Sequence, residues 1–203
     1  MGASVSYNLA KRGLRVLTIE RHGVNNKFGS SHGRTRIIRL AYYEDPRYVP
    51  LLRRAYESWH EVESKSGKKL LQVTGGLMIG KRDGELVKGV LRSAKEHNLA
   101  HEVLSASELE RRFGAFTVGD GMEAVYEGGA GILFAEDCVR SFVGLASEAG
   151  CDFRFSERVE GVEERSRRGR GGDVGREADC VSPGPVRRRM ELGARRRSPS
   201  PAV

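Results

Sequence analysis

Residues 2–20 read GASVSYNLAKRGLRVLTIE, and this stretch decides the class of fold. Residues 3–12 predict a helix that ends at Gly13, because glycine is common just past a helix C-terminus. Residues 14–19 predict a short apolar strand, which Glu20 closes. A Rossmann unit has a comparable order: a strand, a glycine turn, a helix, a second strand and then an acid about 20 residues after the turn.

Gly2 and Glu20 fit two positions of such a unit. A glycine at the start of the helix lets helix and strand pack closely, and the acid accepts hydrogen bonds from the ribose hydroxyls of a dinucleotide. The first strand and the two phosphate-facing glycines would precede Met1. The alternative is an ordinary amphipathic helix, a strand and a solvated Glu20. Residues 2–20 alone leave both interpretations open.

Helices and strands alternate along the rest of the chain as far as about residue 155, which predicts an α/β fold with an interrupted nucleotide-type domain. Asp45 and Pro46 fit the N-cap and first position of a helix. Gly150 fits the end of another helix. The expected helices cover 46–65, 83–97 and 107–113 together with a helix ending at 150, and the expected strands cover 70–80, 101–104 and 151–155.

Composition narrows the class of protein. The chain has 203 residues, of which 38% are hydrophobic and 31% are charged, as in a globular protein. It contains no apolar run of the length that crosses a membrane. The N-terminus has no secretory signal pattern, so we expect a cytoplasmic location. The three cysteines, Cys138, Cys151 and Cys180, have no CxxC spacing, so neither a zinc site nor a disulfide framework is expected.

Residues 165–203 differ from the rest of the chain. They hold 11 arginines and four acids, which accounts for +7 of the net charge of +8, and they contain no aromatic residue. Such a segment cannot bury enough apolar surface to offset its loss of entropy on ordering, so we expect a disordered Arg/Gly/Pro-rich tail. Nucleic-acid binding through this tail is an alternative function. It is not favoured, because no aromatic side chains stand among the arginines for bases to stack on.

A second stretch is more specific than the first. Residues 30–45 read SSHGRTRIIRLAYYED. They resemble the SSHGxxRIIRxAYxED segment of the monomeric sarcosine oxidase family, flavoenzymes that oxidise N-methyl and cyclic secondary amino acids. The similarity continues through residues 48–59, through QVTGG at 72–76 and through YEGGAGILFAEDCVR at 126–140. It covers about residues 1–162 and corresponds to the N-terminal part of these longer enzymes.

The resemblance implies FAD as the cofactor, and a small amino acid and molecular oxygen as the reaction partners. In this family a guanidinium lies beside the flavin ring and a second arginine pairs with the substrate carboxylate. Arg36 matches the first and is the catalytic candidate, and Arg39 matches the second. The cofactor-binding residues that the resemblance implies are Gly2, Glu20, Ser30, Ser31, His32, Arg36 and Val159, with no metal.

The chemistry of arginine fits these roles. A reduced flavin carries negative charge, which a nearby guanidinium stabilises, and an arginine can grip a carboxylate with two hydrogen bonds. If the segment that contains Arg36 and Arg39 is extended, the two side chains point to opposite faces; if it is helical, they share one. Without the surrounding similarity, a solvated basic loop would be the simpler interpretation.

The resemblance also implies a domain organisation. Residues 1–69 and 130–164 would form a partial Rossmann-like FAD-binding domain, and residues 70–129 the start of an inserted, sheet-rich substrate domain. The second half of the family supplies an oxygen-activating lysine, a carboxylate-binding lysine and a flavin-attachment cysteine, none of which can be placed here. We therefore expect an incomplete sarcosine oxidase-type chain that is inactive by itself, with a non-catalytic remnant as the alternative.

Overall fold

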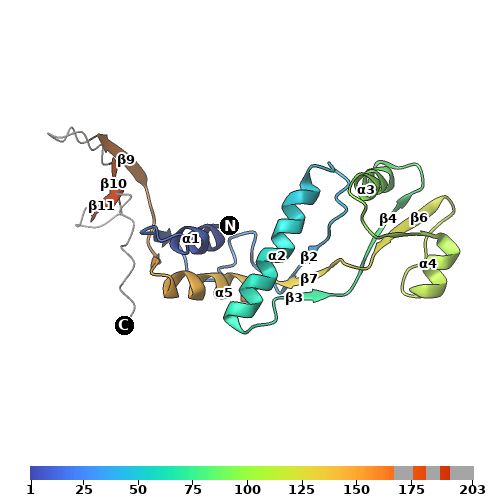
Figure 1. The fold of residues 1–203 in the computed structure, drawn as a ribbon, viewed down its shortest axis with the longest axis horizontal. Coiled ribbons are helices and arrows are strands. Elements are labelled where there is room, and N and C mark those ends of the chain that lie inside the picture. The colour runs from blue at the N-terminus through green and yellow to red at the C-terminus, as the bar shows by residue number, and fades with distance from the viewer. Residues whose placement is uncertain (167–175, 182–187, 193–203) are drawn as a thin grey trace. The chain divides into compact units, whose positions relative to one another are not determined.

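The structure, a computed structural model, describes residues 1–166, 176–181 and 188–192 (Figure 1). Contacts between residues divide the chain into two compact units. The first unit contains residues 1–33 and 136–203, and the second contains residues 34–135. The fold is mixed α/β, as the sequence predicts. Among the residues that the structure describes, no helix combines the length and the apolar character needed to cross a membrane.

The first unit contains a parallel pair of strands with two helices. Strand β1 pairs with β8, with Leu17 opposite Asp152. Helices α1 and α5 contribute buried aromatic rings, and the rings of Tyr7 and Phe142 lie 5.8 Å apart. Each helix is followed by a glycine with positive φ, Gly13 at 80° after α1 and Gly150 at 88° after α5, as the sequence predicts. The bounds are α1 Gly2–Ala10, β1 Leu17–Glu20, α5 Ala135–Glu148 and β8 Asp152–Phe155.

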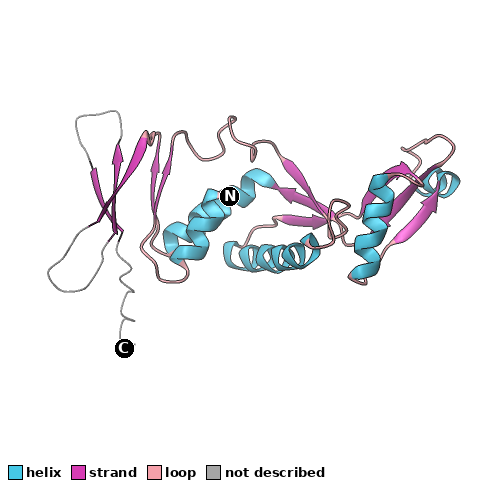
Figure 2. Cartoon of the chain, turned by 90° about the horizontal axis from the view of Figure 1, so that it is seen from above, coloured by secondary structure: helices cyan, strands magenta, loops and turns pink. Residues whose placement is uncertain are grey.

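The second unit contains two antiparallel sheets and the helices α2, α3 and α4. Figure 2 draws helices in cyan and strands in magenta. One sheet has the strand order β2-β7-β3 and the other the order β4-β6-β5, with α3 packed on β4 and β6. Its main core lies between α3 and this second sheet, and Val87, Val90 and Val125 are fully buried there. The bounds are β2 Thr35–Ile38, α2 Tyr48–Ser66, β3 Leu71–Val73, β4 Gly76–Lys81, α3 Glu85–Glu96, β5 Glu102–Ser105, α4 Ala106–Arg112, β6 Met122–Glu127 and β7 Gly131–Phe134.

Two glutamates fix loops in this unit by accepting pairs of consecutive main-chain N–H groups. Glu63 on α2 accepts from Leu70 and Leu71 at 2.8 and 2.9 Å, which ties α2 to the start of β3. Burial alone would raise the pKa of Glu63, but the hydrogen bonds from Leu71, Leu70 and His60 and the charge of Lys69 together lower it. The second glutamate, Glu127, lies at the end of β6 and is described below.

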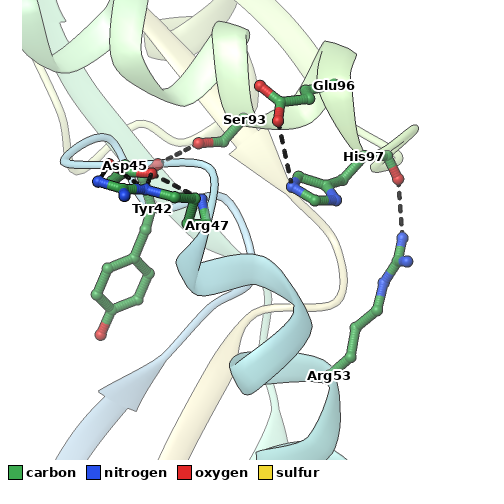
Figure 3. Close-up of polar contacts among 7 residues, drawn as sticks. All are labelled: Tyr42, Asp45, Arg47, Arg53, Ser93, Glu96 and His97. Carbon is green, nitrogen blue, oxygen red and sulfur yellow. Dashed lines mark hydrogen bonds and ion pairs between the residues drawn. The ribbon is translucent and has the colours of Figure 1, made fainter.

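The start of α2 differs from the expected one. The N-cap is Arg47, and neither Asp45 nor Pro46 belongs to the helix. Asp45 turns its carboxylate onto Arg47 instead: Oδ1 accepts from the main-chain N–H at 2.8 Å, and the guanidinium contacts both oxygens (Figure 3). A carboxylate that binds the N–H two residues ahead closes a local turn. This turn delays the helix by two residues relative to the predicted start.

The tail also differs in part from the expectation of disorder. Strands β9, β10 and β11 form an antiparallel sheet in the order β11-β10-β9. Pairing of this kind uses main-chain N–H and C=O groups, so it does not require the aromatic side chains that the tail lacks. The strands are β9 Gly161–Ser166, β10 Arg176–Val181 and β11 Arg188–Leu192. The rest of the expected tail, 167–175, 182–187 and 193–203, lies outside the described residues.

The two compact units have bounds that differ from those of the domains expected from the sequence, whose functional division stays a prediction. Strand β2 pairs with β7, with Arg36 opposite Leu133, and β7 also pairs with β3. These pairings join residues 34–69 and 130–135 to 70–129 as one unit. The sequence did not predict β2, β6 or β7 as strands, because short strands carry little periodic signal of their own. The assignment of 70–129 to substrate binding stays a prediction.

Candidate functional site

The N-terminus of α1 offers main-chain donors to a ligand. The helix begins at Gly2, its N-cap is Met1 without a side-chain cap, and its first turn contains no acidic residue. The first N–H groups of a helix have no partner within the helix, and the positive end of the helix dipole adds to their attraction for anions. A phosphate group is the common ligand of such a helix end.

A pocket of about 290 Å³ opens beside this helix end. Its walls come from the start of α1, the end of β1, the loop after β1, α5 and β8, all within the first unit. Four of the residues predicted to bind the cofactor line it: Gly2, Glu20, Ser30 and Ser31. The remaining lining residues are Met1, Ala3, Thr18, Ile19, Gly23, Val24, Asn25, Asn26, Gly29, Val139, Val143, Phe153 and Phe155. The pocket therefore joins a helix N-terminus, a carboxylate and two hydroxyl groups.

Glu20 is held at the carboxyl end of β1. Its Oε1 accepts a hydrogen bond from the main-chain N–H of His22 at 2.9 Å, and its carbonyl accepts from the N–H of Glu157 at 3.1 Å. These two contacts fix the backbone on either side of the side chain. In open α/β sheets, ligands bind outside the carboxyl ends of the strands. The position of Glu20 follows this rule.

Sequence reasoning missed two asparagines of this pocket. Asn26 Oδ1 accepts from the N–H groups of Phe28 and Gly29, both at 3.1 Å, and so shapes the loop that carries the serines. Asn25 has a positive φ of 60°, and its Nδ2 donates to the carbonyl of Glu136 at 3.2 Å. Its Oδ1 is buried and accepts no hydrogen bond from any described residue. The pair Asn25-Asn26 behind a glycine was the available signal, because asparagine tolerates positive φ and binds its own backbone.

Three further residues of the predicted cofactor set do not line the pocket: His32, Val159 and Arg36, the last of which belongs to the second unit. His32 Nδ1 lies 2.6 Å from the carbonyl oxygen of Gly29, so the imidazole ring helps to hold the loop in its conformation. Val159 is 39% exposed and lies between β8 and β9. Their cofactor contacts stay predictions.

The two predicted site arginines belong to the second unit. Arg36 lies on β2 with an exposed side chain, and its Nη1 donates to the carbonyl of Thr35 at 2.7 Å. Arg39 follows the last residue of β2 and is half-buried. Its guanidinium lies over the ring of Tyr42, with Cζ 4.6 Å from the ring centroid. Its Nε is buried and has no hydrogen-bond partner among the residues that the structure describes.

A parallel β–α arrangement with a ligand-sized pocket at a helix N-terminus defines a dinucleotide-binding class of fold. A family model described as FAD dependent oxidoreductase matches residues 1–182. The chain belongs to this family. The residues around the pocket fit a dinucleotide: the helix end suits a pyrophosphate and Glu20 suits a ribose. Asn25 Oδ1, which is buried and has no partner within residues 1–166, 176–181 and 188–192, is an acceptor for a polar group.

Individual relatives agree with this assignment. The chain is 42% identical over 157 residues to monomeric sarcosine oxidase of Streptomyces avermitilis, which covers 77% of this chain and 41% of the relative. It is 34% identical over 163 residues to N-methyl-L-tryptophan oxidase of Yersinia pestis, and this match covers 80% of this chain and 44% of the relative. The chain thus spans less than half the length of these relatives.

Solved structures show the same fold. NikD, an unusual amino acid oxidase essential for nikkomycin biosynthesis, superposes with a TM-score of 0.72 at 24% identity, over 87% of this chain and 44% of that one. Glycine oxidase from Bacillus cereus superposes with a TM-score of 0.62 at 18% identity, over 87% of this chain and 48% of the glycine oxidase chain. At these identities the likeness establishes the FAD-oxidase fold of this part of the chain.

Proposed function

We propose that this chain is the FAD-binding portion of an amino-acid oxidase that oxidises the C–N bond of N-methyl or secondary amino acids. The observation that carries the proposal is the pocket where Gly2, Glu20, Ser30 and Ser31 meet. The relatives named sarcosine oxidase and N-methyl-L-tryptophan oxidase support the substrate class. The reaction partners are a small amino acid and molecular oxygen.

In this proposal, different residues bind different parts of the cofactor. The N–H groups at the start of α1 bind the pyrophosphate, the carboxylate of Glu20 accepts hydrogen bonds from the ribose hydroxyls, and Ser30 and Ser31 contact the cofactor from the loop. His32 and Val159 complete the cofactor contacts. FAD, when bound, accepts the two electrons and the hydrogen that leave the substrate carbon.

The two arginines, Arg36 and Arg39, each bind a negatively charged group. Arg36 stabilises the negative charge that develops near the flavin ring, because a fixed guanidinium costs no reorganisation during the reaction. Arg39 binds the substrate carboxylate through its guanidinium, whose Nε has no hydrogen-bond partner in the described part of the chain. A fixed carboxylate orients the amine and its C–H bond toward the oxidant, which lowers the entropic part of the barrier. Residues 70–129 form the start of the substrate-binding domain.

The test is to express the protein from its complete reading frame, record its visible spectrum, and measure hydrogen peroxide formed from sarcosine, N-methyltryptophan and proline. We expect a flavin spectrum and peroxide formation that depends on the amino acid. A protein that binds FAD but oxidises none of these amino acids would contradict the substrate class. A protein that takes up no FAD would contradict the proposal as a whole.

The cytoplasm is the compartment that we propose. Among the described residues, Cys151 is a buried thiol outside any disulfide, which suits a reducing environment. Imaging or fractionation of a tagged protein tests this assignment, and a secreted product would contradict it.

A further inference from the structure

The segment that follows β2, residues 39–43, is unusually well held for a loop. It contains Arg39 and Tyr42, whose guanidinium and ring lie against each other. Other parts of the second unit contact its backbone at successive residues, from β6 and from α3. A side chain on such a segment keeps the position that its backbone dictates, so the groups that hold the backbone also place Arg39.

Glu127 provides the most direct of these contacts. It is the last residue of β6 and only 3% exposed. Its Oε1 accepts from the N–H of Leu40 at 2.7 Å, and its Oε2 accepts from the N–H of Ala41 at 3.0 Å. The N–H of Leu40 belongs to the peptide group that also contains the carbonyl of Arg39. The carboxylate therefore fixes the peptide plane next to the arginine.

The surroundings of Glu127 agree with a carboxylate whose two oxygens both act as acceptors. Burial and the negative charge of Glu127 together raise the pKa of Tyr56 to about 12. The Tyr56 hydroxyl stays protonated and donates to the carbonyl of Gly129 at 2.9 Å. Burying a carboxylate costs free energy unless it is hydrogen-bonded. The two main-chain N–H groups that donate to Glu127 offset this cost.

Helix α3 holds the far end of the segment. Ser93 Oγ donates to the carbonyl of Tyr42 (Figure 3). Gly89 lets the backbone of Tyr43 pass close to the helix, because a Cβ at this position would overlap the carbonyl oxygen of Tyr43. With Leu40 and Ala41 held by Glu127, and Tyr42 and Tyr43 held against α3, the segment is supported on both sides.

We propose that Glu127 is a positioning residue for the binding of the substrate carboxylate: it acts through the backbone of Leu40 and Ala41 to place Arg39. This inference rests on the proposed function, since it takes Arg39 as the carboxylate-binding group. Glu127 itself does not touch the substrate. Its removal weakens recognition of the carboxylate and leaves FAD binding intact, because the dinucleotide pocket belongs to the other unit.

The test compares Glu127→Gln with Glu123→Gln in the flavin-loaded protein expressed from its complete reading frame, because the chain by itself is expected to be inactive. Glutamine keeps one acceptor oxygen but turns an amide donor toward the second N–H, so one hydrogen bond is lost at nearly constant volume. Glu123 is the matched control: it lies on the same strand, is 8% exposed, and pairs with Arg82 at 3.3 Å instead of holding the segment. Ser93→Ala is a second, milder variant, because it removes the hydrogen bond that holds Tyr42 at the other end of the same segment.

Three measurements are needed. The first is KM and kcat for an amino-acid substrate, the second is kcat/KM for the amine that lacks its carboxyl group, and the third is the calorimetric Kd of acetate. For Glu127→Gln we expect KM of the amino acid and Kd of acetate to rise about 5- to 50-fold, with kcat/KM of the amine unchanged. Ser93→Ala should shift the same two quantities less, and Glu123→Gln should shift neither.

The outcomes separate this inference from the proposed function. A wild-type protein that oxidises no amino acid and binds no acetate overturns both. A wild-type protein that does both, with a Glu127→Gln variant that binds acetate normally, overturns the positioning role alone. Equal losses for the amino acid and the amine, or equal effects of Glu127→Gln and Glu123→Gln, also overturn it, because general destabilisation does not distinguish substrates by their carboxylate. If Glu127→Gln does not fold, an unchanged acetate Kd in Ser93→Ala overturns it.

Discussion

The pocket beside α1 and the segment after β2 present their polar groups in different ways. Around the pocket, the N–H groups at the start of α1, the carboxylate of Glu20 and the two serines come from the ends of elements and from a loop. At Arg39, the backbone is fixed by a buried carboxylate and by a helix. A large ligand such as a dinucleotide makes many contacts, each of which can be weak. A small carboxylate makes few, so the partner must be placed accurately.

Replacing Arg39 tests the second region and should have the largest effect. We expect Arg39→Ala to lower kcat/KM for the amino acid roughly 10- to 150-fold, mainly through KM, since one charged hydrogen-bonded contact contributes about 1.5–3 kcal/mol. Bound flavin should not change. Steady-state kinetics and the ratio of flavin to protein absorbance measure the two quantities.

Arg54→Ala is the control for Arg39→Ala, because Arg54 is an exposed arginine of the same unit that pairs with Glu57 at 2.8 Å. Its KM should equal that of the unmodified protein. Unchanged KM in Arg39→Ala, or loss of flavin from it, would show that Arg39 does not bind the substrate carboxylate.

Replacing Glu20 tests the first region, where the effect should be smaller because other contacts remain. We expect Glu20→Ala to weaken FAD binding about 5- to 30-fold, through the loss of hydrogen bonds to the ribose. Fluorescence titration of the apoprotein with FAD measures the Kd. Glu157→Gln is the control, because Glu157 is a half-buried acid of the same unit that does not line the pocket. Equal affinity in the Glu20 and Glu157 variants would rule out the ribose contact.

The exposed ion pair between Asp45 and Arg47, just before α2, should have the smallest effect when it is removed. The hydrogen bonds from Arg47 lower the pKa of Asp45 from 3.8 to about 2. Because the folded protein favours the ionised carboxyl, the pair contributes stability above pH 4, and this contribution is lost as the pH falls through about 2. The guanidinium side chain is 89% exposed, so solvent screens the pair.

An NMR titration measures this pKa directly. Arg47→Ala should return the pKa of Asp45 toward 3.8 and leave the binding of acetate unchanged, in contrast to Glu127→Gln. Arg92→Ala is the control, since Arg92 contributes only the smallest part of the shift. A pKa that does not move in Arg47→Ala would show that the pair does not persist in solution.

The sequence by itself determined the local features of the chain and its family. Gly13 and Gly150 marked the ends of their helices, because a residue that takes up positive φ without strain can be recognised from its type alone. The blocks SSHGRTRIIRLAYYED and YEGGAGILFAEDCVR identified the family because several residues recur in a fixed order. Asp45 was predicted as the N-cap of α2, and this prediction was wrong because its carboxylate closes a local turn with Arg47 instead.

The tertiary structure decided which distant residues meet. The pocket brings Gly2 and Glu20 together with the loop serines and two asparagines that local patterns did not mark as functional. Glu127 reaches Leu40 across 87 residues of sequence, and no spacing rule connects the two positions. The physical reason is that caps and turns depend on the few residues beside them. The environment of a buried carboxylate depends instead on how strands and helices pack, which is a property of the whole unit.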